Sequence, residues 1–199
     1  MNSPSNSWRA HAFLQGTRLF GLSFAPGNGI AVTGTALHIV EHTQMKDGRL
    51  LVGSKGGQRY RVVQVIKELP VLICEVEWMK DEPDVMKPDD EFTLEELADE
   101  TRTLFLNMLR LSNKAKTGDA DEPEGLAEQL GQLDAQALSW WMMNVFVEHP
   151  QEQQMMLDMT SARERLERAR SVLRETCSYL SATSALKSAL SDIEKKEEE

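Results

Sequence analysis

Long apolar runs are absent from this sequence of 199 residues. A bilayer span needs roughly 18 consecutive apolar residues, so we expect no membrane-spanning segment. The first residues, MNSPSNSWRAHAFLQG, also lack the apolar core of a secretory signal. Cysteine is scarce too, because Cys74 and Cys177 are the only two. They lie far apart at predicted core positions, which favours buried free thiols and a reducing compartment.

The motifs of common catalytic and nucleotide-binding sites are missing as well. A phosphate-binding loop ends in Lys-Ser/Thr before a helix, whereas Ser54-Lys55-Gly56-Gly57 has another order and leads into a predicted strand. No G-x-S-x-G elbow or Cys-His pairing indicates a hydrolase. His38 and His42 lie in a predicted strand, where four residues span about 13 Å, too far to share a metal ion. We therefore expect no enzyme activity, no catalytic, cofactor-binding or metal-binding residues, and no cofactor.

Basic residues are few and unevenly distributed. The chain has 22 Lys/Arg and 32 Asp/Glu, a net charge of −10. Residues 1–80 contain nine Lys/Arg and five Asp/Glu, whereas residues 81–199 contain 13 and 27. The composition thus changes near residue 81, from a mildly basic half to an acidic half. Nucleic-acid binding needs clustered Lys/Arg to neutralise phosphates, so the acidic balance argues against it.

The first half does contain strand patterns separated by turn residues. Five runs rich in apolar or β-branched residues predict strands: 18–25, 32–42, 50–52, 59–66 and 71–78. In the last run, Cys74, Val76 and Trp78 alternate with Glu75 and Glu77. Glycine-containing turns are predicted at 26–29, 47–48 and 56–57. Short strands at this spacing are typical of a curled antiparallel sheet or a small barrel.

Helical patterns follow a polar, proline-containing linker at residues 81–92. The sequences Thr93-x-x-Glu96 and Ser161-x-x-Glu164 have the form of capping boxes. Helices are predicted over 93–111, 126–133, 137–147, 151–159 and from 161 onward. The last and longest helix has an apolar face predicted to be buried: Ala162, Leu166, Ala169, Leu173, Cys177 and Leu180. Its charged face is predicted to lie in solvent: Arg163, Arg165, Glu167, Arg168, Arg170 and Glu175.

Two groups of residues have the chemistry of a binding surface. Met and Trp side chains at 140–143 and at 155, 156 and 159 can hold apolar peptides. Adjacent tryptophans on a helix point about 100° apart, which favours the alternative that these side chains fill the interface between sheet and helices. Arg59, Tyr60 and Arg61 could also contact a partner, but strand alternation predicts that they point out, in and out.

The order and spacing of several short motifs resemble a known family. The motif Gln58-Arg59-Tyr60-Arg61-Val62 follows a DGR-L-L segment and a glycine pair. Further motifs lie at 18–21 (RLFG), 34–36 (GTA), 39–42 (IVEH), 110–113 (RLSN) and 152–154 (EQQ). Together, over residues 18–191, they resemble the N-terminal substrate-recognition domain of the Lon protease, and more closely the stand-alone LON-domain proteins of cyanobacteria and plant plastids.

The resemblance implies an α+β fold, a PUA-like antiparallel β pseudo-barrel followed by an α-helical subdomain. Residues 1–80 would form the β part, 81–92 a linker, 93–192 the helical part, and 193–199 a charged tail predicted to be disordered or frayed. Relatives begin with a proline-rich strand and a helix, and this sequence starts about where that helix would end. We therefore expect the β part to lack the first strand and most of the first helix.

The resemblance also implies a function in protein quality control. The expected function is non-catalytic recognition of unfolded or client proteins and peptides, as an adaptor or chaperone-like regulator of proteolysis. A protease component is a further expected partner, because the ATPase and protease modules of Lon have no counterpart here. A plastid or a cytoplasm is the compartment implied by these relatives. PUA-like folds elsewhere bind RNA, so an RNA- or ligand-binding module is the alternative. Partner-binding residues stay unassigned.

Overall fold

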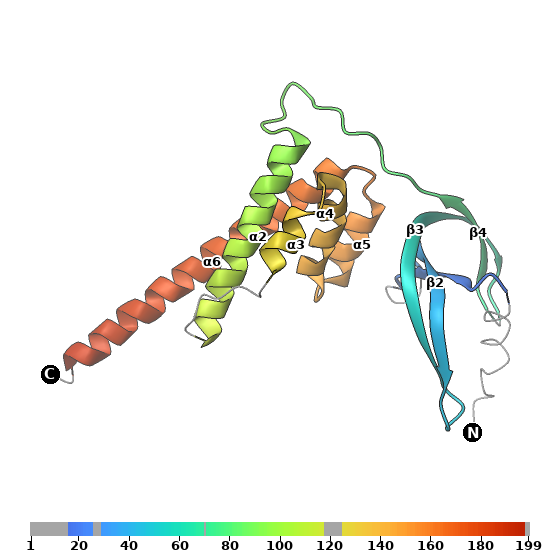
Figure 1. The fold of residues 1–199 in the computed structure, drawn as a ribbon, viewed down its shortest axis with the longest axis horizontal. Helices are drawn as coiled ribbons and strands as arrows, with labels where there is room; N and C mark the ends of the chain where they lie inside the picture. Colours follow the sequence, from blue (N-terminus) through green and yellow to red (C-terminus); the bar gives the residue numbers. More distant parts are fainter. Residues whose placement is uncertain (1–15, 26–28, 70, 118–124, 198–199) are drawn as a thin grey trace. The chain divides into compact units, whose positions relative to one another are not determined.

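The chain forms two compact units, shown in Figure 1 in a computed structural model that describes residues 16–25, 29–69, 71–117 and 125–197. The β unit comprises the residues up to Lys80 together with Pro150–Thr160, and the helical unit comprises Asp81–His149 and the residues from Ser161 onward. The fold is α+β, as predicted, with an antiparallel sheet followed by helices. Within the described residues, no helix combines the length and the apolar character that a membrane crossing requires.

The described part of the β unit contains one antiparallel sheet with the strand order β1-β2-β3-β4. Its strands are β1 (Leu19–Ser23), β2 (Thr33–Gln44), β3 (Leu50–Lys67) and β4 (Ile73–Trp78). Each strand pairs with the next one along the chain, so β1 and β4 are the two edges of the sheet. The prediction of an antiparallel sheet from alternation and turn residues is therefore confirmed.

The separate strands predicted at 50–52 and 59–66 are wrong, because both belong to the continuous strand β3. The glycine pair Gly56-Gly57 lies inside this strand, where Gly56 pairs with Leu37 of β2. A Cβ atom at Gly57 would lie 3.3 Å from the carbonyl oxygen of Ala36, near a register shift in the β2–β3 ladder. These glycines permit close strand approach at an irregularity instead of forming a turn.

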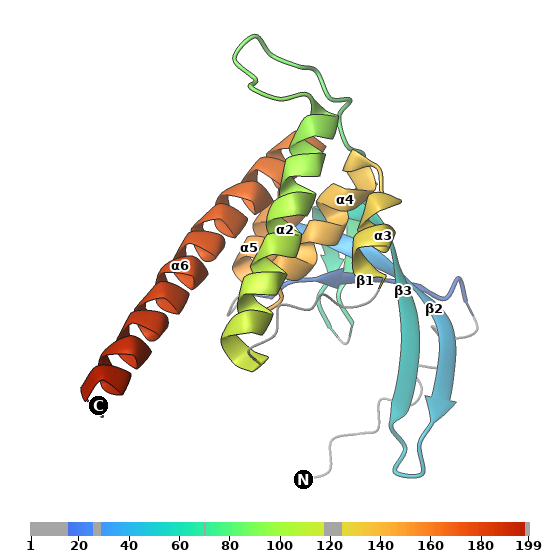
Figure 2. The ribbon, with the colours of Figure 1, turned by 60° about the vertical axis from the view of Figure 1, so that its left-hand side comes forward.

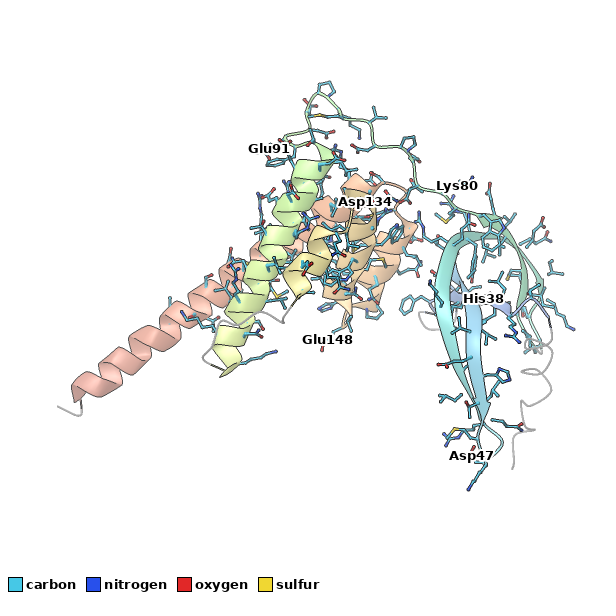
Figure 3. All side chains as sticks on the ribbon, in the orientation of Figure 1. His38, Asp47, Lys80, Glu91, Asp134 and Glu148 are labelled. Atoms are coloured by element: carbon cyan, nitrogen blue, oxygen red, sulfur yellow. The ribbon has the colours of Figure 1, made fainter. Side chains whose placement is uncertain are left out.

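The predicted turn at Asp47-Gly48 is confirmed at the tip of the β2–β3 hairpin, where Figure 3 labels Asp47. Gly48 has φ 84°, a left-handed conformation that glycine adopts without strain. The Asp47 carboxylate accepts hydrogen bonds from the backbone N–H and Nε of Arg49, at 3.0 and 2.7 Å. These bonds hold the pKa of Asp47 below its usual value. The turn predicted at 26–29 and the expected N-terminal truncation fall largely on residues outside the described ranges.

Helix α5 (Pro150–Asp158) belongs to the β unit, although it begins 72 positions after the end of β4 in the sequence. Arg59 of β3 donates hydrogen bonds to the carbonyl oxygens of Leu157 and Met159, at 2.5 and 2.7 Å. The prediction that Arg59 points outward is wrong, since only 7% of it is exposed. A cation at the end of a helix satisfies carbonyl groups that lack partners within the helix.

The helical unit contains α2 (Leu94–Thr117), α3 (Leu126–Gly131), α4 (Ala135–Trp141), the 3₁₀ helix η1 (Met142–Phe146) and α6 (Ala162–Glu197). Helices α2 and α6 lie side by side (Figure 2). The capping box at α2 is confirmed, because Thr93 Oγ1 accepts from the N–H of Glu96 while Glu96 Oε2 accepts from the N–H of Thr93. Asp134, labelled in Figure 3, caps α4 by accepting from the N–H of Ala137 at 2.7 Å.

The apolar face of α6 is buried as predicted, except that Leu180 is only partly buried. Ala162, Leu166, Ala169, Leu173 and Cys177 are each at most 8% exposed. Burial raises the pKa of the Cys177 thiol, and both cysteines are free, with Cys74 only partly buried. Helix α6 continues to Glu197, so it includes most of the charged tail predicted at 193–199. Glutamate and lysine are good helix formers, so a charge run extends a helix readily.

Two arginines on the charged face of α6 are buried, contrary to the prediction that they lie in solvent. Arg163 is 7% exposed and donates from Nε and Nη2 to the carboxylate of Asp84, at 2.8 and 2.7 Å. The hydrogen bond with Asp84 raises the pKa of Arg163. Arg165 is fully buried and pairs with Asp81. Residues 81–84 therefore pack on α6, and their carboxylates stabilise buried guanidinium groups.

The paired tryptophans pack within the helical unit. The Trp140 ring lies under the guanidinium of Arg165, with 3.7 Å between the Arg165 Cζ atom and the ring centroid. Trp141 meets Phe105 edge to face at a centroid distance of 5.0 Å. Met142 beside them is fully buried. These contacts support packing rather than peptide binding for residues 140–142.

Candidate functional site

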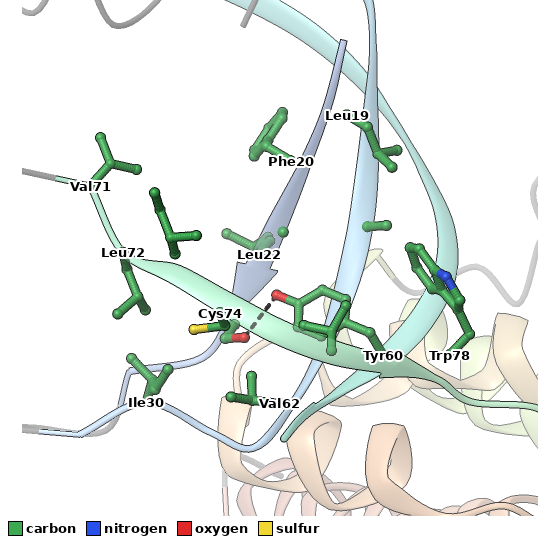
Figure 4. A pocket seen from close by; sticks show the side chains of 15 residues that line it. Leu19, Phe20, Leu22, Ile30, Tyr60, Val62, Val71, Leu72, Cys74 and Trp78 are labelled. Carbon is green, nitrogen blue, oxygen red and sulfur yellow. Dashed lines mark hydrogen bonds between the residues drawn. The ribbon is translucent and has the colours of Figure 1, made fainter. Parts of the chain in front are cut away.

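An apolar groove of about 740 Å³ lies in the β unit, lined mainly by the two edge strands β1 and β4 (Figure 4). The residues that line it are Leu19, Phe20, Gly21, Leu22, Ser23, Ile30, Ala36, Tyr60, Val62, Val71, Leu72, Ile73, Cys74, Val76 and Trp78. None of these residues carries a charge at neutral pH. The groove is thus a site for apolar groups.

The alternation of β4 explains one wall of the groove. Cys74, Val76 and Trp78 line it, while Glu75 and Glu77 between them are exposed and are not part of its lining. A strand places successive side chains on opposite faces, so the sequence pattern of this strand directly determines its apolar face. The predicted separation of the apolar and acidic residues of 74–78 is therefore confirmed.

Tyr60 of β3 supplies the floor of the groove and its one buried hydroxyl. Its side chain is 6% exposed, and its Oη lies 2.9 Å from Ser23 Oγ of β1. The ring crosses two glycines: a Cβ at Gly21 would lie 2.4 Å from Tyr60 Oη, and one at Gly34 would lie 2.5 Å from Tyr60 Cζ. Glycine at both positions lets the tyrosine lie flat on β1 and β2. The prediction that Tyr60 points inward is confirmed.

Large apolar side chains are exposed along the groove. Leu22 is 58% exposed, Ile73 48% and Trp78 47%. A second hollow of about 390 Å³ shares Leu19, Ala36 and Trp78 with the groove. Contiguous exposed apolar surface of this kind marks binding sites more often than isolated apolar residues do. The sequence alone does not identify the partner-binding residues, because the exposure of edge-strand residues depends on what packs over them.

His38 and His42, the two histidines at four-residue spacing, both lie on β2 and are exposed. His38 pairs across the ladder with Lys55, and these two residues border the second hollow. Among the residues that the structure describes, no three His, Cys, Asp or Glu side chains are grouped to hold a metal ion. The groove itself offers a phenol, a hydroxyl and a thiol among apolar groups. Its chemistry suits the burial of apolar side chains.

Comparison with known proteins identifies the family. The family model for the ATP-dependent protease La (LON) substrate-binding domain matches residues 25–175. A search of curated proteins found no match. Among solved structures, a Lon N-terminal domain protein from Xanthomonas campestris is 18% identical, with TM-score 0.53, covering 84% of this chain and 83% of its own. The N-terminal domain of the Mycobacterium avium complex Lon protease is 16% identical, with TM-score 0.57, covering 89% and 87%.

At these identities the solved structures establish a shared fold, and the family model extends over most of the chain. The four-stranded antiparallel sheet and the helices that follow it agree with that fold. The predicted resemblance to Lon N-terminal domains is therefore confirmed. The chain belongs to the LON substrate-binding domain family, and this membership implies a role in substrate recognition.

Proposed function

We propose that the chain recognises unfolded or extended segments of client proteins by burying their apolar side chains in the groove between β1 and β4. The observation that carries this proposal is an uncharged groove of about 740 Å³ with half-exposed leucine, isoleucine and tryptophan at its surface. Burial of apolar surface contributes about 25 cal/mol per Å². Burial of a few apolar side chains of an unfolded segment could therefore supply the binding affinity, and the sequence of the rest of the client would matter little.

We further propose that recognition is the whole activity of this chain, and that it acts as an adaptor or chaperone-like regulator of proteolysis. Among the described residues that line the groove, no acid, base or nucleophile lies beside a partner that would activate it. A separate protease component would then receive the bound client. Nucleic acid fits the groove poorly, because none of the described residues that line it is a lysine or an arginine.

Substitutions along the groove test the proposal against matched controls. Leu22→Thr and Ile73→Thr remove exposed apolar groups from the groove and keep residues that suit strands. Leu51→Thr and Ile66→Thr are the controls, because Leu51 and Ile66 are 63% and 65% exposed in β3 and do not line the groove. Binding to a reduced, alkylated and permanently unfolded protein would be measured by fluorescence anisotropy.

The expected result is weaker binding by the two groove variants, about tenfold when they are combined, and unchanged binding by the two controls. Near-ultraviolet circular dichroism would verify that all four variants are folded. Equal binding by the groove variants and the controls would overturn the proposed site. Absence of any binding by the unsubstituted chain would overturn the proposed function.

A further inference from the structure

The structure also indicates which extended segments the groove selects. We propose that β4 accepts an additional strand at its free edge, and that the preferred segment alternates apolar and basic residues. This inference rests on the proposed function, since it defines the client chemistry of the same groove. Its apolar residues would enter the groove, and its basic residues would lie beside Glu75 and Glu77.

The free edge of β4 provides the backbone part of this recognition. In the described residues β4 is a sheet edge that pairs with β3 alone, and its apolar residues Cys74 and Val76 line the groove. An unpaired strand edge offers a row of N–H and C=O groups that a further strand can satisfy. A segment of about six residues would match the six residues of β4.

The acidic face of β4 provides the electrostatic part of this recognition. Glu75 and Glu77 are exposed, and their cross-strand neighbours on β3 are Gln64 and Arg61. Glu75 therefore has no basic residue directly opposite it on that side. On the free side, an added strand would place its outward side chains next to both carboxylates. Opposite charges directly across a ladder stabilise the pairing, and like charges destabilise it.

The same two glutamates argue against a second copy of this chain as the occupant. In an antiparallel pair, directly opposite residues point to the same face. If Cys74 and Val76 of both copies are to stay on the apolar face, even-numbered residues of one β4 must lie opposite even-numbered residues of the other. Odd-numbered residues then lie opposite odd-numbered residues. Every such register that pairs more than three residues of each β4 places Glu75 or Glu77 opposite a glutamate of the other copy. The lysines or arginines of a basic client segment would pair with Glu75 and Glu77, whereas a second copy would add two more negative charges beside them.

Three synthetic peptides test the proposal on the full chain: Thr-Val-Lys-Val-Lys-Val-Thr, the same peptide with both lysines replaced by glutamate, and the same peptide with both replaced by glutamine. Fluorescence anisotropy at low ionic strength would measure the dissociation constants. We expect the lysine peptide to bind roughly tenfold more tightly than the glutamate peptide, with the glutamine peptide between them.

Charge-reversal variants locate the preference. In Glu75→Lys/Glu77→Lys the order of the lysine and glutamate peptides should reverse. Glu41→Lys/Glu68→Lys is the control, because it makes the same change of charge in the β unit at exposed residues outside β4 and should keep the original order. Lysine peptides N-methylated at alternate residues test strand addition itself. One methylation frame should abolish binding, and the other should leave it nearly intact.

The outcomes separate this inference from the proposed function. Binding of all three peptides with equal affinity, or equal tolerance of both methylation frames, overturns strand addition on β4 and leaves apolar capture in place. Failure of all three peptides and of an unfolded protein to bind overturns both. Analytical ultracentrifugation would detect dimers that form as the protein concentration rises. If Glu75→Lys/Glu77→Lys changes the dimer dissociation constant, the β4 edge binds a second copy, contrary to the proposal.

Discussion

The guanidinium of Arg165 forms a bidentate ion pair with the carboxylate of Asp81, 84 positions earlier in the sequence. The Arg165 side chain is fully buried and that of Asp81 is 11% exposed. Arg165 Nε also donates to Ser139 Oγ at 3.1 Å, and the Trp140 ring covers the guanidinium. This network fastens the first residue of the helical unit to its longest helix.

Removing the carboxylate from this pair should destabilise the helical unit strongly. Asp81→Ala removes the carboxylate that forms two hydrogen bonds with the buried Arg165 guanidinium, and removing one partner of a buried ion pair typically costs about 3–5 kcal/mol. Urea denaturation would measure the loss of unfolding free energy. Asp47→Ala is the matched control, because its partner Arg49 is 75% exposed and an exposed ion pair contributes little to stability. Similar losses in the two variants would contradict the buried network.

Arg59→Gln should loosen α5 within the β unit. The substitution removes the donors that reach the carbonyl oxygens of Leu157 and Met159, and each buried hydrogen bond contributes about 0.5–1.5 kcal/mol. Hydrogen–deuterium exchange should accelerate in residues 150–158. Arg61→Gln is the control, because Arg61 is exposed two residues further along the same strand. If both variants exchange alike, Arg59 does not hold the helix.

These arginines show where sequence reasoning fails. An arginine at a polar position of a strand or helix pattern can be exposed to solvent or buried against a distant partner. The sequence patterns around Arg59 and Arg165 do not distinguish these two cases. Their partners lie 98 and 84 positions away, and only the tertiary fold brings them together. Local signals with local causes were predictable: the Thr93–Glu96 capping box, the turn at Asp47-Gly48, and the two faces of β4.

The candidate groove has one part that the local sequence predicts and another part that depends on the tertiary fold. Its β4 wall follows from alternation, but its floor depends on Tyr60 lying over glycines of two other strands. Gly56-Gly57 has the composition of a turn and instead lies within β3, because β2 is long enough to pair along it. Which apolar residues stay exposed depends on the packing over the edge strands, and a strand pattern contains no information on that packing.

Gly34→Ala should destabilise the β unit through a steric conflict. A Cβ atom there would lie 2.5 Å from both Ser23 Oγ and Tyr60 Cζ, so the tyrosine would have to leave the floor of the groove. Displacing a packed core side chain costs about 1–3 kcal/mol. Gly29→Ala is the control, because nothing lies within 4 Å of the Cβ it would add. Thermal unfolding would compare the variants, and equal midpoints would show that Tyr60 adapts without penalty.

Glu100 links α2 to α6 and should make the helical unit sensitive to acid. It accepts a 3.0 Å hydrogen bond from Nη1 of Arg170 and a further one from Nη2 of Arg174. Burial acts to raise the pKa of the Glu100 carboxyl, but the two arginines outweigh it and lower the pKa below the usual 4.5. The charged carboxylate is therefore the form that the folded state stabilises.

The sign of the pH dependence follows from that lowered pKa. The stabilisation is fully present above about pH 4.5, the usual value, and is lost as the pH falls through the lower folded-state pKa. Glu100→Gln should therefore lower the unfolding free energy by about 1–2 kcal/mol at pH 7, and the difference from the unsubstituted chain should shrink below pH 4.5. Glu95→Gln, in the exposed first turn of the same helix, is the control. A Glu100→Gln penalty that stays constant from pH 7 to pH 3 would mean that shape rather than charge holds α2 to α6 at this position.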